Sequence, residues 1–507
     1  MESRRDPYFW LLNANLNINL YGVNIPLSAT LTQQNRSFTQ PFNQFGISPK
    51  YKGVTVHLGY RSMVFSNYSS GGNIFLGGGV DLAPANSWVK LSSFYGRFTK
   101  AVAAAGTDGL VTGTPAFERW GGGLKLTMGK QNNYVDLIAF KAKDRINSIP
   151  ITTDANDPLK PAENFVASIN TAQKIGKKLS FNGELAFSAY TVDQRAPDVV
   201  LQNYTYINNL GALYKTNASS QFNKAIMANI VYSEKYYQLK FMYRRIDPEY
   251  KSLGCVFLNN DLEDITATVS WRMLKNKINM STSGGLQRNN VNKQLATQMT
   301  RLIGSANITW AATPRLNFTA NVANFNSSTS LQRVNGIDSL SYSQVTTSGG
   351  GSINYSLGNN AKRHNLFLMG NAQQANDNSG KSTTFYNSNL GYQLSFSQQA
   401  LSITGAATAS RNASGFAQGI SAGFSLGLTK QLLAKKLRLT VNSTYLQTYL
   451  NNLVTGSNRI YRVNTMYTIN KHHALSADIN ALIKISTLTT VKSFQEYRGT
   501  LVYTFTF

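Results

Sequence analysis

Apolar and polar residues alternate along most of this chain. Between residues 10 and 20, one parity holds only apolar side chains and the other is rich in asparagine. A period of two places successive side chains on opposite faces of a strand. The pattern recurs at 179–187, 237–244, 315–322, 436–445 and 461–469, and no long segment has a convincing helical period. The alternation predicts an all-β protein.

The polar face of these strands distinguishes a membrane protein from a soluble one. It consists mostly of Asn, Ser, Thr and Gln with scattered Arg and Lys, and aromatic residues gather toward strand ends. In a soluble sandwich the outward face is usually charged, whereas lipid outside and water inside suit the observed composition. Only a closed ring satisfies every backbone group of a sheet in hydrocarbon. We therefore expect residues 1–507 to form a single transmembrane, antiparallel, up-and-down β-barrel.

The connections between strands support this prediction. Their spacing corresponds to about 24 strands, within a range of about 22–26. Short connections such as 128–132 alternate with longer ones such as 144–162, which is typical of periplasmic turns and external loops. The connection 191–221 is expected to be a long external loop or to fold inward.

Closure of the ring requires the first and last strands to pair, because pairing removes both sheet edges. We expect residues 10–20 to lie beside residues 499–507. The side chains expected at this seam are Trp10, Leu12, Leu16, Tyr503, Phe505 and Phe507.

Composition narrows the class further. Charged residues make up 14% of the 507, against roughly 25% in soluble domains, while 11% are aromatic. This argues against an ordinary cytosolic enzyme and against disorder. No run of eighteen apolar residues occurs, which excludes a helical membrane protein.

The net charge of +26 arises from two groups of basic residues. One group lies at the short turns, including Lys130, Lys174 and Lys177, where it is expected to anchor the barrel at lipid headgroups. The other lies on the polar parity and is predicted to line the lumen: Lys240, Arg244, Arg272, Arg438, Arg462 and Arg498. These cations would concentrate anions, unless aspartates and water screen them. No dense basic stripe with interleaved aromatics occurs, so no nucleic-acid partner is expected.

Catalytic and metal motifs are scarce. The four histidines and single cysteine form no C-x-x-C or H-E-x-x-H spacing, and no G-x-S-x-G elbow is present. We therefore predict no catalytic site, no cofactor, no metal site and no enzyme; hydrolysis lost on His57→Ala would revive that alternative. The glycine triplets at 77–79, 121–123 and 349–351 lack the Lys-Ser/Thr of a phosphate loop. They are expected to bend strands or let a plug approach the wall.

Residues 34–52 interrupt the regular turn pattern. They form a long connection, rich in Gln, Asn, Phe and Pro, where a short periplasmic turn is expected. Because 22-stranded barrels already need a plug, the lumen here should be filled by residues 34–52, by residues 191–221 or by a partner. The plug hypothesis places Phe38, Pro41, Phe42 and Phe45 against the inner wall; the alternative is an ordered periplasmic loop.

Several segments resemble a known group of proteins. Residues 37–52, SFTQPFNQFGISPKYK, and residues 57–61, HLGYR, resemble a poorly characterised family of large outer-membrane β-barrel proteins from the Bacteroidota. Residues 95–97, 140–144 and 161–164 are similar to further segments of that family. The resemblance covers about the first 200 residues and implies a barrel in the bacterial outer membrane, with no established activity. The start at Met1 lacks a signal peptide, so we expect a trimmed or fragmentary chain.

Two functions are consistent with these features. The first is an outer-membrane channel, or part of a transport or secretion assembly, whose lumen is gated or occupied by a segment or partner. The second is a non-conducting outer-membrane platform that displays surface loops or anchors accessory outer-membrane or periplasmic proteins. Both require outer-membrane lipid as a partner.

Overall fold

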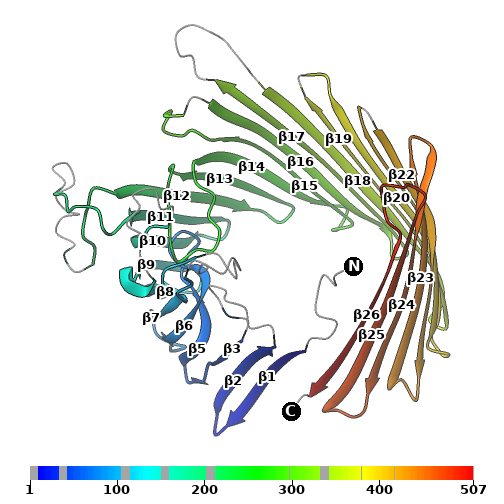
Figure 1. Ribbon diagram of the computed structural model, residues 1–507, viewed down its shortest axis with the longest axis horizontal. Helices are drawn as coiled ribbons and strands as arrows, with labels where there is room; N and C mark the ends of the chain where they lie inside the picture. The colour runs from blue at the N-terminus through cyan, green and yellow to red at the C-terminus, as the bar shows by residue number, and fades with distance from the viewer. Residues whose placement is uncertain are drawn as a thin grey trace. The chain divides into compact units, whose positions relative to one another are not determined.

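A computed structural model describes the chain over residues 10–33, 41, 43–103, 115–149, 159–200, 211, 213–295, 297–331, 342–377, 379–415 and 417–505. Figure 1 shows strands throughout, and the one helical element among these residues is a short 3₁₀ turn, η1 (Ile146–Ser148). Within the same residues, no helix is both long enough and apolar enough to cross a membrane.

The first strands in chain order are β1 (Leu11–Leu20), β2 (Val23–Thr32), β3 (Gln44–Ile47), β4 (Lys50–Tyr51), β5 (Val54–Val64), β6 (Gly71–Leu82), β7 (Val89–Thr99), β8 (Arg119–Lys130), β9 (Asn133–Asp144), β10 (Glu163–Ile175), β11 (Leu179–Thr191), β12 (Ser220–Ser233) and β13 (Tyr237–Ile246). The later strands are β14 (Leu262–Met273), β15 (Ile278–Arg288), β16 (Thr297–Thr313), β17 (Leu316–Leu331), β18 (Tyr342–Gly358), β19 (Lys362–Asp377), β20 (Ser382–Phe396), β21 (Leu401–Ser414), β22 (Ala417–Leu432), β23 (Leu437–Leu450), β24 (Leu453–Thr468), β25 (His473–Ser486) and β26 (Phe494–Phe505).

These strands form one sheet of 26 members. Successive strands pair antiparallel from β5 to β12 and from β15 to β26. The short strands β3 and β4 both pair with β2 and β5, so together they occupy one sheet position. The predicted all-β, up-and-down antiparallel fold is confirmed, and the strand number lies at the top of the predicted range. Closure into a transmembrane barrel stays a prediction.

Contacts divide the sheet into two compact units. The first contains residues Met1–Tyr232, Phe241–Ile265 and Asn289–Lys293, and the second contains Ser233–Lys240, Thr266–Arg288 and Gln294–Phe507. Each unit is described by itself below.

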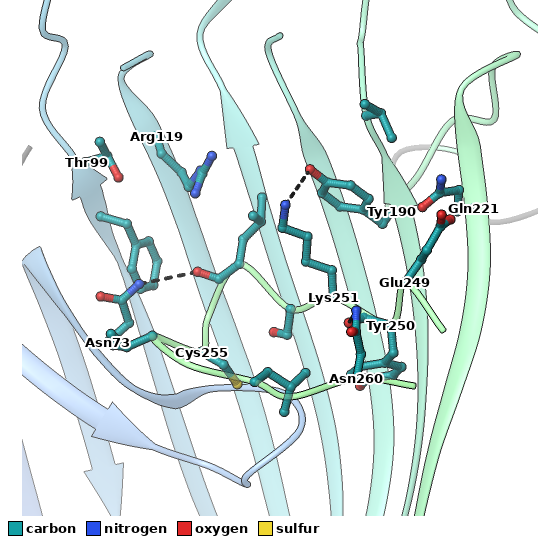
Figure 2. Close-up of a pocket in the computed structure, with 16 residues that line it drawn as sticks. Asn73, Thr99, Arg119, Tyr190, Gln221, Glu249, Tyr250, Lys251, Cys255 and Asn260 are labelled. Carbon is teal, nitrogen blue, oxygen red and sulfur yellow. Dashed lines mark hydrogen bonds between the residues drawn. The ribbon is translucent and has the colours of Figure 1, made fainter. Parts of the chain in front are cut away.

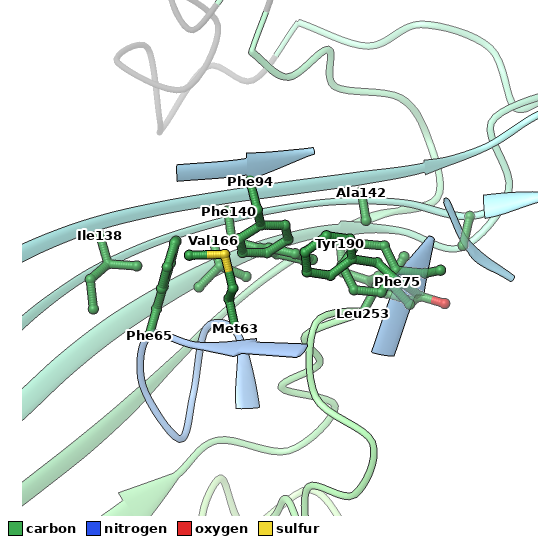
Figure 3. Close-up of a cluster of buried hydrophobic side chains, with 12 residues drawn as sticks. Met63, Phe65, Phe75, Phe94, Ile138, Phe140, Ala142, Val166, Tyr190 and Leu253 are labelled. Atoms are coloured by element: carbon green, nitrogen blue, oxygen red, sulfur yellow. The ribbon is translucent and has the colours of Figure 1, made fainter. Parts of the chain in front are cut away.

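The first unit has an exposed outer face and a buried inner face. On the outer face, Leu124 and Phe187 are 48% and 54% exposed. On the opposite parity, Phe75, Phe94 and Phe140 are buried in a hydrophobic cluster (Figure 3). The rings of Phe75 and Phe94 stack with centroids 4.6 Å apart. The inner face of this unit is therefore a packed core.

The second unit keeps the predicted division into apolar and polar faces. Large apolar side chains of one parity, such as Leu426, Tyr461 and Leu501, are exposed. The other parity carries polar pairs between strands, such as Ser283 with Ser305. Rows of exposed apolar side chains on this scale mark a surface that contacts lipid or another protein, and the alternation with polar residues favours lipid.

Because the inner face of the first unit is packed, truncating a side chain on that face should cost more stability than truncating one on the exposed face. We expect Phe94→Ala to lower the free energy of unfolding by about 3–5 kcal/mol, because it leaves a cavity in the core. Phe187→Ala on the exposed face should cost at most about half as much. Urea unfolding of the protein in detergent or lipid checks both values, and equal losses would contradict the assignment of faces.

Candidate functional site

Two connections between strands fold onto the inner face of the first unit. Residues 65–70, between β5 and β6, and residues 247–261, between β13 and β14, are called the inner segments. They hold each other: the Tyr250 hydroxyl donates to the Tyr68 carbonyl at 2.9 Å, and the Ser252 hydroxyl donates to the Ser69 carbonyl. The Gly71 N–H, at the start of β6, also donates to the Gly254 carbonyl at 3.0 Å.

Asn164 on β10 anchors the longer inner segment to the wall. Its side chain is fully buried, and its Oδ1 accepts from the Leu253 N–H at 3.0 Å. Its Nδ2 donates to the Lys251 carbonyl at 3.3 Å and to the Ser188 hydroxyl at 2.9 Å. An asparagine amide offers both donors and an acceptor, which this geometry uses. Without it, the Leu253 N–H would lose this partner, while the Lys251 carbonyl would keep the Ser188 hydroxyl.

Apolar contacts complete the attachment. Tyr68 and Tyr250 are buried edge to face, with ring centroids 6.4 Å apart, and pack with Ala186, Ala225 and Ile246. Burial raises the pKa of Tyr68 to about 12 and that of Tyr250 well above its usual range. Both hydroxyls therefore stay neutral at physiological pH, and Tyr250 remains a hydrogen-bond donor.

A cavity of about 700 Å³ lies between the longer inner segment and the wall (Figure 2). Its lining includes Lys251 and Glu249 of the segment and Tyr190 and Arg119 of the strands. The Lys251 ammonium lies 3.2 Å from the Tyr190 hydroxyl, and the Arg119 guanidinium is held by both carboxylate oxygens of Asp144, at 2.7 and 3.0 Å. Mixed charges and hydrogen-bonding groups make this a site for water or a polar solute.

Cys255 lies where the two inner segments meet. Its thiol contacts the carbonyl oxygens of Asn67 at 3.3 Å and Ser69 at 3.8 Å. Burial raises the pKa of the Cys255 thiol. A raised pKa lowers the thiolate fraction, so this residue is not an activated nucleophile.

His57 takes part in a polar chain near the short-turn end of the inner face. Its Nδ1 lies 3.0 Å from the Ser48 hydroxyl, and its Nε2 lies 2.9 Å from Asp81. In a serine hydrolase the aspartate binds Nδ1 and the serine faces Nε2, so the arrangement here is reversed. We interpret it as a link that fastens the interrupted strand β3–β4 to β5 and β6. The expectation of no enzymatic activity stays a prediction.

Among the predicted lumen cations, Lys240 and Arg244 share the parity of Ile246, which packs against the inner segments. The Arg244 guanidinium pairs with Asp264, whose carboxylate is buried on β14. Arg272 has the same parity as Asp264 on that strand. Asp264 thus neutralises the charge of Arg244.

The structure brings two further members of that set together. Arg462 and Arg498 are both register partners of Asn480, and the Arg462 Nε lies 2.8 Å from Asp478. Arg438 instead pairs in register with Met466. A lumen-lining role for the six cations stays a prediction.

The predicted plug segment lies partly in the sheet. Residues 44–47 and 50–51 form β3 and β4, and Phe45 is 61% exposed with its ring edge to face against Tyr60. Pro41 is described without a partner strand, whereas Phe38 and Phe42 lie outside the described residues. The segments that cover the inner face are instead residues 65–70 and 247–261. A sequence signal for this cover was the adjacent aromatic pair Phe94 and Tyr95 on β7. Because neighbours on a strand face opposite sides, one of the two rings must point inward and needs a cover that excludes water.

The connection 191–221 is described at its two ends. Tyr214 packs with Phe165, Ala189 and Phe222 on the parity of the exposed Phe187, so this end covers the outer face. Residues 201–210 and 212 lie outside the described residues.

For the predicted seam, Leu12 and Leu16 lie on β1 and Trp10 directly before it, while Tyr503 and Phe505 lie on β26. Phe507 is outside the described residues. Pairing at the seam stays a prediction.

Comparisons with known proteins give weak similarities. No family model matches the chain, and no curated protein matches it. Among solved structures, the copper transporter OprC has a TM-score of 0.34 and 8% identity, covering 99% of this chain and 72% of that one. The ferric-catecholate import receptor Fiu from E. coli K12 has a TM-score of 0.34 and 11% identity, covering 95% and 78%. Acinetobacter baumannii OccAB2 has a TM-score of 0.31 and 11% identity, covering 68% and 91%. These similarities identify no family for the chain.

The contact between Cys255 and the start of β6 allows a direct test of the inner segments. A Cβ added at Gly71 would lie 3.6 Å from the Cys255 Cβ, within the range of disulfides. We expect Gly71→Cys to cross-link with Cys255 under mild oxidation, which non-reducing electrophoresis and peptide mass spectrometry detect. The Gly71→Cys, Cys255→Ser double variant is the control. A protein that stays reduced in the presence of oxidant would contradict the packing.

The raised pKa of the Cys255 thiol predicts slow alkylation at neutral pH, with a rate that rises as the pH increases. Asn164→Ala should accelerate alkylation, because it frees the longer inner segment to open. Stopped alkylation followed by mass spectrometry measures the rate. Equal rates in both proteins would show that Asn164 does not hold the segment.

Proposed function

We propose that this protein is an outer-membrane β-barrel that acts as a channel, or as part of a transport or secretion assembly, gated by its inner segments. The observation that carries the proposal is the paired attachment of residues 65–70 and 247–261 to the inner face, with Asn164 as the central contact. Exposed apolar residues on the other face support membrane insertion. Kinship with the outer-membrane proteins of the Bacteroidota, suggested by residues 37–52, is part of this proposal.

Hydrogen bonds to main-chain groups and the packing of Tyr250 and Leu253 hold the longer inner segment. Asn164 supplies two of its main-chain hydrogen bonds, and Ser188 donates to the Lys251 carbonyl as well. A buried polar group that loses its partner costs about 1–3 kcal/mol, so the Asn164 contacts supply part of the free energy that holds the segment closed. Motions of loops on this scale occur within microseconds to milliseconds.

The cavity beside Lys251 lies on the side of the inner segments where strands meet the long connections, since Thr99, Arg119 and Val192 line it. In outer-membrane barrels the long connections are external. The cavity would therefore receive a polar solute before the gate, with Lys251 and Glu249 as contacts. The predicted lumen cations would attract anions.

A second candidate function is the non-conducting platform. The hydrophobic cluster of Phe75, Phe94, Phe98 and Phe140 favours it, because a packed core of this kind closes the inner face of the first unit permanently. In that case the membrane anchors the barrel, and its surface loops or accessory proteins carry the function.

Conductance in planar lipid bilayers separates the two functions. For a gated channel, we expect Asn164→Ala to raise the open fraction about tenfold, the effect of losing roughly 1.4 kcal/mol of closing free energy. Oxidised Gly71→Cys should remain closed, and reduction should restore wild-type openings.

Asn324→Ala is the matched control, because Asn324 lies on β17 of the second unit and donates a hydrogen bond to Thr347. It should conduct as the wild type does. Silence of the wild type, of Asn164→Ala and of the reduced Gly71→Cys protein would contradict the channel and support the platform.

A further inference from the structure

A groove of about 900 Å³ lies over the outer face of the first unit, across β7 to β10. It is placed at the strand ends that lead into long connections, since Arg145 and Ile146 follow β9 directly. The groove is lined on this face by Tyr95, Trp120, Gly122, Lys141, Lys143 and Phe165.

Strand register places these side chains in two rows across the sheet. The rows are Tyr95, Gly122, Lys141 and Phe165, and next to it Arg97, Trp120, Lys143 and Glu163. The neighbouring row toward the short turns contains Leu124 and Ala139, and Leu137 follows on β9. On the outer face, the row of Leu124 and Ala139 is apolar, and the next rows toward the long connections are aromatic and cationic. The change occurs at the same height on neighbouring strands. That change marks the boundary between acyl chains and headgroups.

Gly122 creates the gap in the first row. A Cβ at this position would lie 2.5 Å from the Phe94 carbonyl oxygen and 3.0 Å from Tyr95 Cδ2, so no larger residue fits. The first row therefore carries no side chain between Tyr95 and Lys141, and the edge of the Tyr95 ring lies beside this position. Gly122 alone of the triplet at 121–123 lies on the outer face, because Gly121 and Gly123 share the inner parity of Ala142 and Phe140.

The rim of the groove carries more positive than negative charge. Lys141 and Lys143 share Glu163, each with its ammonium 3.2 Å from the carboxylate. Arg97 and Arg145 share Glu118, at 3.7 and 3.0 Å. Four cations thus divide two carboxylates among them.

The two outermost cations are also the most accessible. The side chains of Lys143 and Arg145 are 54% and 63% exposed. The Arg145 guanidinium lies 5.2 Å from the centre of the Trp120 ring, which stacks on Tyr95 at 5.6 Å. The stacked rings hold Arg145 beside the groove, where it could meet a phosphate together with Lys143.

We propose that this groove binds a phosphorylated glycolipid of the outer leaflet. Lys143 and Arg145 contact its phosphate, and an acyl chain lies over Gly122, Leu124 and Ala139. Surplus positive charge above an apolar floor matches a lipid that joins an anionic headgroup to hydrocarbon. The inference rests on the proposed membrane location and orientation, but it does not depend on conduction.

Native mass spectrometry of the delipidated protein in detergent, titrated with bisphosphorylated lipid A, tests the site. We expect Lys143→Gln, Arg145→Gln to weaken binding at least about tenfold, because charge-assisted hydrogen bonds are lost. The design leaves Lys141 with Glu163 and Arg97 with Glu118, which preserves one cation for each carboxylate. Lys174→Gln, Lys177→Gln at a short turn removes the same charge elsewhere and should bind as the wild type does.

Two further arms separate the parts of the proposal. Ala139→Phe, which fills the floor without changing charge, should also weaken binding, and dephosphorylated lipid A should bind the wild type poorly. Equal affinity of phosphatidylglycerol would overturn the glycolipid assignment. Equal binding by the wild type and the Lys143, Arg145 variant would overturn the site itself. Heat-modifiable migration on electrophoresis confirms that each variant is folded, and bilayer conductance reports separately on the proposed gate.

Discussion

An unpaired backbone N–H or C=O group costs several kcal/mol wherever water is excluded, and this constraint underlies the sheet of this protein. The chain meets it through long antiparallel hairpins, such as β16 with β17 and β23 with β24. Once the backbone is committed to this ladder, side chains alternate strictly between two faces. Every functional feature described above depends on which environment each face meets.

The sequence predicts the ladder well, because the period of two is a local signal. Val441, Tyr461 and Leu501 lie on the exposed parity that the alternation indicates. Burial of the inner face could not be predicted in the same way. Leu253 meets Asn164 across a sequence separation of 89 residues, and no local pattern encodes such a contact. Phe45, expected in a plug or a loop, lies on a short strand that the loop-like composition did not reveal, and a plug formed by residues 34–52 stays a prediction.

In the first unit, some apolar side chains lie on the inner face and some polar ones on the outer face, the reverse of the usual arrangement in a barrel. Phe94 and Phe140 point inward, where a wet lumen would favour polar groups, while Gly122 and Lys141 point outward. The inward aromatics are stable only because the inner segments cover them and exclude water. Conversely, Tyr68 and Tyr250 of those segments are held by Ala186 and Ala225 of the wall. Wall and segments therefore depend on each other for burial.

This mutual dependence determines what kind of gate is physically reasonable. Complete withdrawal of both inner segments would expose Phe75, Phe94 and Phe140 to water, at about 1.5–3 kcal/mol for each large apolar side chain. Release of the Asn164 contacts alone would cost far less, because Leu253 is the main residue of the longer segment in that cluster. In the proposed gate, residues 247–261 would move while residues 65–70 stay in place, which breaks the hydrogen bonds of Tyr250 and Ser252 to Tyr68 and Ser69. This movement would widen the cavity beside Lys251 while the aromatic core stays covered by Met63 and Phe65.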